Sequence, residues 1–213
     1  MGAKERRDRE RTETRDKILA AARDMFAEEG YDAVTMRAIA DRIEYTPTAL
    51  YHHFESKQAL LTELCERDFI ALARQFAQAA EKDPVERILA TGRAYVRFAQ
   101  AYASQYRFMF MTVFPDVGDA KGHRGDPSQD AYAFLRQACQ EAIEQGRLRP
   151  DIKDPDQLAQ ILWATVHGLI SLRIVKGHQT WFPWGDAEEN TEAAMKVLLH
   201  GILAESSSRR RQP

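Results

Sequence analysis

The stretch TMRAIADRIEYTPTALYHHF, residues 35–54, constrains the fold of this chain more than any other. It predicts two short helices joined by a tight turn, because the hydroxyls of Thr35 and Thr46 can each cap a helix by accepting a backbone N–H hydrogen bond. Pro47 follows the second cap, where its fixed φ suits the first position of a helix. This spacing is typical of a helix-turn-helix, but an ordinary helical hairpin has the same spacing, and both remain open at this point.

Composition favours a globular, all-helical protein. The 213 residues are 44% hydrophobic and 29% charged, and the few glycines and prolines fall mostly between long periodic segments. No apolar run approaches the roughly 20 residues that span a bilayer, and the charged N-terminus does not resemble a secretory signal. Cys65 and Cys139 stand far apart without a CxxC context, which is typical of reduced, buried thiols. We therefore expect a cytoplasmic protein with no membrane partner.

Charge does not indicate a nucleic-acid partner by itself. The net charge is −2, and residues 1–57 hold 11 Lys and Arg against 12 Asp and Glu, a net of −1. Any DNA binding must therefore depend on where individual basic side chains are placed.

The N-terminal residues 1–13 form a mixed-charge arm without apolar anchors, which we expect to be disordered. Its basic side chains could follow phosphates or enter a minor groove, or the arm could simply be a solvated tail. After it, residues 14–29 carry apolar residues at helical spacing and predict an amphipathic helix that ends at Gly30.

Residues 15–64 resemble the DNA-binding domain of the TetR/AcrR family of bacterial transcriptional regulators. The motifs that carry the resemblance are ILAAARDMFAEEGY at residues 18–31, TMRAIA at residues 35–40 and LYHHFESKQAL at residues 50–60. The family implies a three-helix DNA-binding domain at residues 14–57. It also implies a helical effector-binding and dimerisation domain at residues 58–205, followed here by a tail, residues 206–213, that we expect to be disordered.

The chain departs from the family in the turn of the helix-turn-helix. The family usually has Gly-Val-Ser there, whereas this chain has Glu44, Tyr45 and Thr46. Thr replaces Ser as a cap without difficulty. Glu44, however, takes the place of a glycine that commonly adopts a left-handed backbone, and it brings a negative charge near the expected phosphates. We interpret this as tuning of binding.

The resemblance assigns the DNA contacts to the second helix of the motif, whose N-terminal part enters the major groove. It places Thr46, Thr48 and Ala49 nearest the base edges, which hydroxyl and methyl groups can read. Phosphate contacts fall to Tyr51, His52 and Lys57, and Arg37 is a further candidate for the backbone or an edge base. For each of these residues, and for His53, a solvated surface position is the alternative.

Residues from about Pro84 onward predict further helices rich in apolar and aromatic side chains. Three of these helices should begin at an aspartate cap followed by proline, at Asp83-Pro84, Asp126-Pro127 and Asp154-Pro155. The segment from Tyr106 to Phe114 is apolar on nearly all sides, so it is either deeply buried or lines part of a cavity. His167 is either an effector contact or a core histidine, and its helix lacks the spacing of metal ligands. The predicted pocket, for a largely apolar effector, consists of Phe108, Met111, Phe114, Trp163, His167 and Trp181.

Three functions remain for comparison. The resemblance implies a homodimeric repressor, paired through its last two long helices, that leaves a palindromic operator when an effector binds. The alternative is a helical binding or interaction module that lacks specific DNA binding, for which Glu44 and the near-neutral N-terminal region are the support. An enzyme is disfavoured because the chain has no nucleophile elbow, P-loop, dinucleotide fingerprint, HExxH motif or plausible carboxylate pair. We expect no cofactor and no metal.

Overall fold

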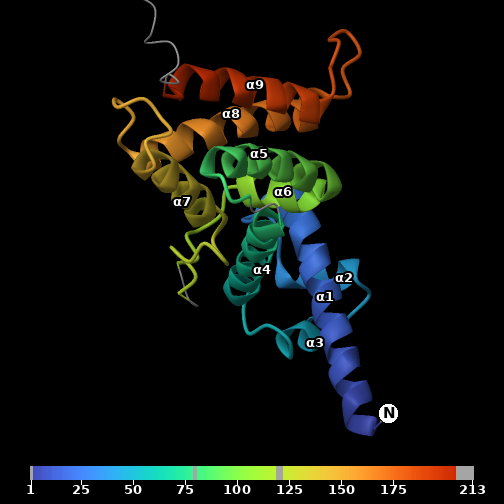
Figure 1. The fold of residues 1–213 in the computed structure, drawn as a ribbon. Coiled ribbons are helices and arrows are strands. Elements are labelled where there is room, and N and C mark those ends of the chain that lie inside the picture. Colours follow the sequence, from blue (N-terminus) through green and yellow to red (C-terminus); the bar gives the residue numbers. More distant parts are fainter. Residues whose placement is uncertain (1, 79–80, 119–121, 205–213) are drawn as a thin grey trace, which may run out of the picture. The chain divides into compact units, whose positions relative to one another are not determined.

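The computed structural model describes residues 2–78, 81–118 and 122–204, and within these ranges no β-strand occurs. The helices are α1 (Ala3–Glu29), α2 (Met36–Arg42), α3 (Pro47–Tyr51), α4 (Lys57–Gln78), α5 (Pro84–Ala101), α6 (Ala103–Met111), α7 (Ala131–Glu144), α8 (Pro155–Lys176) and α9 (Ala187–Ile202) (Figure 1). The all-α prediction is confirmed. The predicted tail, residues 206–213, lies outside the described residues.

The chain divides into two compact units, and the division falls inside α4. The first unit runs to Phe69 and also takes in Tyr102–Gly122, whereas the second contains Ile70–Ala101 and the residues from His123 onward. The predicted boundary after residue 57 differs from this division, because α6 belongs with α1, α2 and α3. The physical reason is that Phe108 of α6 is fully buried and stacks on Phe26 of α1 at 6.2 Å between ring centroids.

Helix α1 is longer than predicted, because residues 3–13 continue it as regular helix. The predicted arm is therefore helical in this structure. Glu5 accepts a hydrogen bond from the Gly2 N–H at 2.8 Å at the start of the helix, and Arg6 and Glu10 form an i,i+4 ion pair at 3.7 Å. Lys, Arg and Glu are good helix formers, and such pairs each add a few tenths of a kcal/mol, so alternating charges extend a helix that tertiary packing already nucleates.

A buried ion-pair network joins three helices of the first unit. Asp68 of α4 is 1% exposed and accepts two hydrogen bonds from the Arg23 guanidinium of α1, both at 2.7 Å. Gln105 of α6 donates a third hydrogen bond to Asp68 at 2.9 Å. Because a buried carboxylate is stable only when its charge is compensated, this network fixes α1, α4 and α6 to one another.

The second unit is a helical bundle in which α5 packs against α7, α8 and α9, and α8 packs against α7 and α9. Helix α8 begins at Pro155, after Asp154 caps its first turn by accepting from the Asp156 N–H at 2.9 Å and the Gln157 N–H at 3.2 Å. This is the cap and proline arrangement that the sequence predicts. Helix α7 instead begins four residues later than the predicted start at Asp126-Pro127, because Asp130 is its cap and Asp126 forms a turn with Ser128.

Helix α8 corrects the expectation that nothing in the chain is apolar enough to cross a membrane. Among the described residues it alone passes that test, with a mean hydropathy of 1.5 over its most apolar window, of which 28% is buried. Its charged residues, Asp156, Arg173 and Lys176, all lie near its two ends. Length and composition alone do not separate a membrane span from a helix that buries its apolar face against another protein surface.

Both cysteines are free and buried, as predicted. Burial raises the pKa of the Cys65 thiol and of the Cys139 thiol to about 12. Since the thiolate is the reactive form, both side chains act as small apolar groups.

Candidate nucleic-acid interface

The two helices of the motif are capped as the sequence predicts. Thr35 accepts a hydrogen bond from the Ala38 N–H at 3.1 Å, and Thr46 accepts one from the Ala49 N–H at 3.2 Å. Pro47 occupies the first turn of α3. The motif is therefore a helix-turn-helix in which α3, only five residues long, is the second helix.

The side chains of α3 separate into an anchor and an outward surface. Leu50 is fully buried and Phe54, just after the helix, is 3% exposed, so these two fasten α3 to the domain. Thr46, Thr48 and His52 are exposed, and Tyr51 is 54% exposed. The remaining predicted contact on α3, Ala49, is half-buried. The structure therefore gathers most of the predicted readers on one accessible surface of α3.

The turn before α3 retains the left-handed backbone that the family normally gives to glycine. Glu44 has φ of +60°, and among the described residues it is the one non-glycine with a positive φ. A side chain in this region costs of order 1 kcal/mol, which the surrounding turn must absorb. Tyr45 helps to hold the turn by donating its N–H to the Ala40 carbonyl at 2.9 Å. The departure from the family motif therefore changes the charge of the turn, while Glu44 keeps a left-handed backbone.

The two predicted basic contacts have different surroundings. The Arg37 side chain is 82% exposed and its ion pair with Asp41 is long, 3.9 Å, so its guanidinium is accessible. The Lys57 ammonium instead donates to the Tyr31 and Val34 carbonyls, both at 2.9 Å, and lies 4.1 Å from the centroid of the Tyr31 ring. Lys57 would have to release these carbonyls to reach a phosphate, and in this structure it fixes the segment between α1 and α2.

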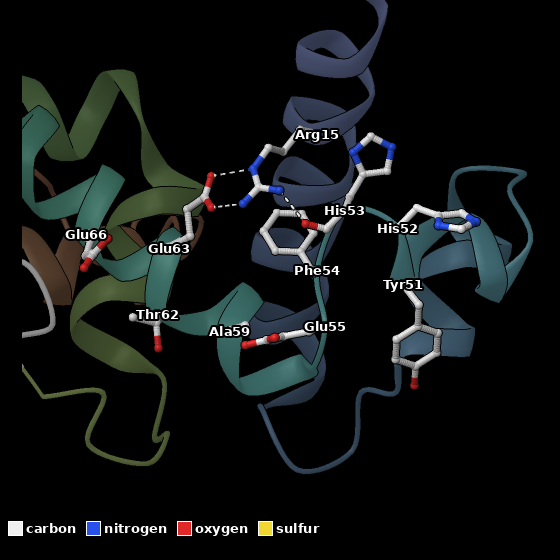
Figure 2. A pocket seen from close by; sticks show the side chains of 10 residues that line it. All are labelled: Arg15, Tyr51, His52, His53, Phe54, Glu55, Ala59, Thr62, Glu63 and Glu66. Atoms are coloured by element: carbon white, nitrogen blue, oxygen red, sulfur yellow. Dashed lines mark hydrogen bonds and ion pairs between the residues drawn. The ribbon is translucent and has the colours of Figure 1, made fainter. Parts of the chain in front are cut away.

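Arg15 of α1 is not among the residues predicted from the sequence, although it holds the segment after α3 in place. Its guanidinium binds the Glu63 carboxylate and the His53 carbonyl oxygen, and it lies 4.0 Å from the centroid of the Phe54 ring. Figure 2 shows Arg15 between Glu63 and the chain at His53, with Tyr51 extending away from it. The sequence could have indicated this role, because Arg15 lies three residues before the buried Ile18 and therefore on the same face of α1.

A cavity of about 530 Å³ opens beside the end of α3 (Figure 2). The lining residues are Arg15, Tyr51, His52, His53, Phe54, Glu55, Ala59, Thr62, Glu63 and Glu66. Its lining is acidic, because three glutamates face it and the one guanidinium is already bound to Glu63. Burial, followed by the charges of Arg11, Arg15 and His52, lowers the pKa of His53, which keeps that imidazole neutral near pH 7. The acidic cavity therefore does not suit a phosphate, which leaves the exposed side of α3 as the candidate DNA-facing surface.

The predicted effector residues are divided between the two units: Phe108, Met111 and Phe114 belong to the first, and Trp163, His167 and Trp181 to the second. Phe108 is fully buried in the core of the first unit, and Phe114 stacks on it at 5.3 Å between centroids, while Met111 is 37% exposed. Trp181 lies between α8 and α9, is 77% exposed and contacts the Phe182 ring. The sequence shows that these side chains are apolar. It does not separate a core residue from a pocket residue, because both occur at the same apolar spacing along a helix.

Trp163 and His167, in contrast, come together on α8 through a third residue that is not among the predicted ones. The buried Tyr95 hydroxyl of α5 accepts a hydrogen bond from the Trp163 indole N–H at 3.2 Å and lies 3.1 Å from Nδ1 of His167. Burial lowers the pKa of His167, so its ring is neutral near pH 7. The sequence could have indicated Tyr95, because it lies in an alanine-rich helix that is expected to be buried. A buried tyrosine hydroxyl needs a hydrogen-bond partner.

Two family models match this chain. Residues 18–64 match "Bacterial regulatory proteins, tetR family", and residues 88–202 match "Tetracyclin repressor-like, C-terminal domain". The second match alone covers more than half of the 213 residues. The chain belongs to the TetR family. This TetR-family chain is therefore a DNA-binding transcriptional regulator and not an enzyme.

Curated relatives of this TetR-family chain carry the same function. The transcriptional repressor KstR2 of Mycolicibacterium smegmatis is 28% identical over 202 residues, which cover 88% of this chain and 90% of KstR2. The transcriptional regulator UidR of Escherichia coli is 39% identical over 75 residues, but the match covers only 35% of this chain and 36% of UidR. This chain therefore spans about a third of the length of UidR.

Solved structures agree with the family fold. A protein of unknown function from Rhodococcus sp. RHA1 has a TM-score of 0.68 at 25% identity, over 89% of this chain and 95% of that protein. The ketosteroid transcriptional regulator KstR2 of Mycobacterium tuberculosis has a TM-score of 0.57 at 23% identity, over 90% of this chain and 96% of KstR2. The second likeness supports the fold of the TetR-family chain and, at that identity, nothing finer.

Proposed function

We propose that this regulator is a cytoplasmic homodimeric repressor that reads a palindromic operator through α3 and leaves it when a small, largely apolar effector binds. The observation that carries the proposal is the outward surface of α3, where Thr46, Thr48 and Tyr51 are exposed while Leu50 anchors the helix. Hydroxyl and methyl groups at the start of the helix can read base edges, and the tyrosine hydroxyl and His52 can bind phosphates.

Pairing through α8 and α9 is supported by the apolar side chains that these helices expose. On α8, Ile161, Leu172 and Val175 are 48%, 57% and 48% exposed, and on α9 Val197 is 73% exposed. Together with Thr165 and Gly168, the α8 residues follow one another at spacings of 4, 3, 4 and 3, the heptad pattern of a helix that pairs with another helix. A second copy of this chain would cover this surface without a membrane, and two-fold symmetry is the usual form of such pairing.

The effector contact is proposed at Trp163 and His167. The Trp163 indole is 39% exposed although its N–H is hydrogen-bonded to Tyr95, so an apolar face of the ring remains accessible. Beside it, the hydrogen-bonded Tyr95 hydroxyl and His167 imidazole form a polar group that could orient one carbonyl or hydroxyl group of a ligand. Phe108 and Trp181 are not part of this contact, because Phe108 is a core residue and Trp181 packs on the Phe182 ring.

Two substitutions on α3 test the DNA-reading proposal. Thr48→Ala should change which bases are preferred at one position of each half-site, with a discrimination loss of about 1–3 kcal/mol if a base contact disappears. Tyr51→Ala should weaken binding to every sequence by a similar factor, because a phosphate contact carries no sequence information. Binding of both variants to a panel of single-base operator changes measures the difference. An unchanged preference in Thr48→Ala would remove Thr48 from base readout, and absent operator binding by the unaltered chain would favour the interaction-module alternative.

A steroid ketone is the first effector to test, because it is largely apolar and carries a carbonyl group, the kind of ligand proposed above for Trp163 and His167. It should raise the melting temperature of the regulator and release labelled operator, whereas a matched saturated fatty acid provides the comparison. Trp163→Ala should weaken the steroid's binding about tenfold or more while operator affinity without steroid stays the same, and Trp181→Ala should change neither. Steroid binding that is unaffected by Trp163→Ala would place the effector elsewhere.

A further inference from the structure

The first three turns of α1 project beyond the packed part of the helix. Residues 4–13 are all exposed and contain no apolar side chain, and the first fully buried residue of α1 is Ile18. Figure 1 shows α1 continuing past α3 toward its N-terminal end. At about 1.5 Å per residue, these ten residues form a rod roughly 15 Å long. A segment of this length without apolar side chains adds little to the stability of the core. Its side chains are therefore candidates for contacts with another molecule.

Three basic residues of this rod form a row on one side of the helix, which we call the basic row: Lys4, Arg7 and Arg11. Their spacing of 3 and 4 places them on one helical face, and Arg15, Ile18 and Ala22 continue the same row at spacings of 4, 3 and 4. Ile18 and Ala22 are fully buried and Arg15 binds the His53 carbonyl, so this face of α1 is the one turned toward the core of the first unit. The basic row therefore extends the inward face of α1 beyond the domain core.

The opposite side of the rod differs in charge. Arg6 and Glu10 lie there as an ion pair, together with Glu13. Within the described ranges, Lys4, Arg7 and Arg11 form no ion pair with an acidic side chain. Asp8 is the acidic residue that lies nearest to this row around the helix axis. Cations are thus segregated toward one face even though residues 4–13 are nearly neutral as a whole.

The basic row also has a defined position relative to α3. Arg15, the next member of the helical row, binds the carbonyl of His53, two residues after the end of α3. Arg11 lies one helical turn before Arg15 in the same row, so it lies near the same end of α3, and its charge contributes to lowering the pKa of His53. The row begins beside the helix that would enter the major groove and runs outward from it.

We propose that the basic row binds the phosphate backbone of duplex DNA just outside the half-site that α3 reads. The proposal rests on the proposed function, and it adds a second DNA contact that lies outside the helix-turn-helix. Lys4 and Arg11 are about 10 Å apart along the helix, a length over which duplex DNA carries roughly six phosphate charges. Because the helix already orders this segment, binding immobilises only side chains and not the backbone. Such contacts increase affinity and its salt dependence without changing base preference.

The test compares two triple variants with the same loss of charge. The first is Lys4→Gln, Arg7→Gln and Arg11→Gln, and the second, on the opposite side of α1, is Arg6→Gln, Arg9→Gln and Lys17→Gln. Operator binding of the full chain is measured from low to high salt on a duplex with long flanks and on one trimmed to the two half-sites. Every exchanged side chain is exposed, and equal melting temperatures would confirm intact folds.

On the long duplex, the first variant should lower the slope of log affinity against log salt by about 2–3 for each subunit, and weaken binding by about tenfold or more at moderate salt. The second variant should change the slope by less than about 1. On the trimmed duplex, the first variant should bind like the unaltered chain. Equal losses in the two variants, no loss in either, or the same loss on both duplexes would overturn the proposal. Failure of the unaltered chain to bind either duplex would instead contradict the proposed function.

Discussion

A variant carrying Leu172→Glu and Val175→Glu is expected to be a monomer and to bind its operator at least about 100-fold more weakly than the unaltered chain. Both side chains are about half exposed in the single chain, so the exchange does not disturb the core of the bundle. In a dimer, however, it would place four carboxylates in an apolar interface, where unpaired charges are strongly unfavourable. Affinity falls because a monomer binds only one half-site. In the dimer, binding of one subunit holds the other at a high effective concentration near the second half-site, and the monomer loses this gain.

Light scattering after size exclusion measures the mass, and a fluorescence titration with labelled operator measures the affinity. The unaltered chain should have twice the 24.3 kDa chain mass, and the double variant should have the single mass with unchanged helical circular dichroism. Val113→Glu is the matched control, because Val113 is 92% exposed in the first unit and lies outside the proposed interface. A double variant that stays dimeric would exclude this face of α8 as the interface.

Asp68→Ala is expected to destabilise the first unit by about 3–5 kcal/mol, the usual effect of removing one partner from a buried ion pair. The change leaves the Arg23 guanidinium, only 17% exposed, without its carboxylate, and it also removes the acceptor of the Gln105 amide. Since domains are stable by only about 5–15 kcal/mol, much of the first unit's stability would be lost. Operator binding should then fall together with folding.

Urea unfolding followed by circular dichroism measures this effect, with Asp16→Ala as the control. Asp16 also pairs with an arginine, Arg67, at 2.6 Å, but the two side chains are 55% and 44% exposed. An exposed pair contributes about 0–1 kcal/mol, so the control should unfold nearly as the unaltered chain does. Similar unfolding of the two variants would mean that the Asp68 network does not hold α1, α4 and α6 together.

The parts of the fold that were predictable from the sequence are those set by local chemistry. The Thr35 and Thr46 caps and the proline after the second cap each depend on a few adjacent residues, and the structure has all of them. The backbone at Glu44 was left open by the sequence, and the structure shows it to be left-handed. The start of α7 was not predicted correctly, because Asp126 and Asp130 are both good caps. Only the turn that Asp126 makes with Ser128 distinguishes them.

Other features depend on long-range pairing and were beyond the reach of periodicity. The phosphate contact predicted at Lys57 is drawn from a family motif, whereas the structure uses its ammonium to bind two carbonyls from a distant segment. Phe108 was predicted as a pocket residue because it is aromatic, but its stacking on Phe26 places it in the core of the first unit. Sequence spacing describes one face of one helix, and the identity of the element that meets this face comes only from the fold.

Selection of binding sites from a random duplex library tests the central claim of sequence-specific operator reading most directly. The account predicts enrichment of one inverted repeat with half-sites about one helical turn, or a multiple of it, apart. Its affinity for the chain should fall steeply with salt, and Thr48→Ala should enrich a repeat altered at a symmetric pair of positions. Enrichment of no sequence, or of a single unrepeated site bound equally well by the Leu172→Glu and Val175→Glu variant, would contradict the account.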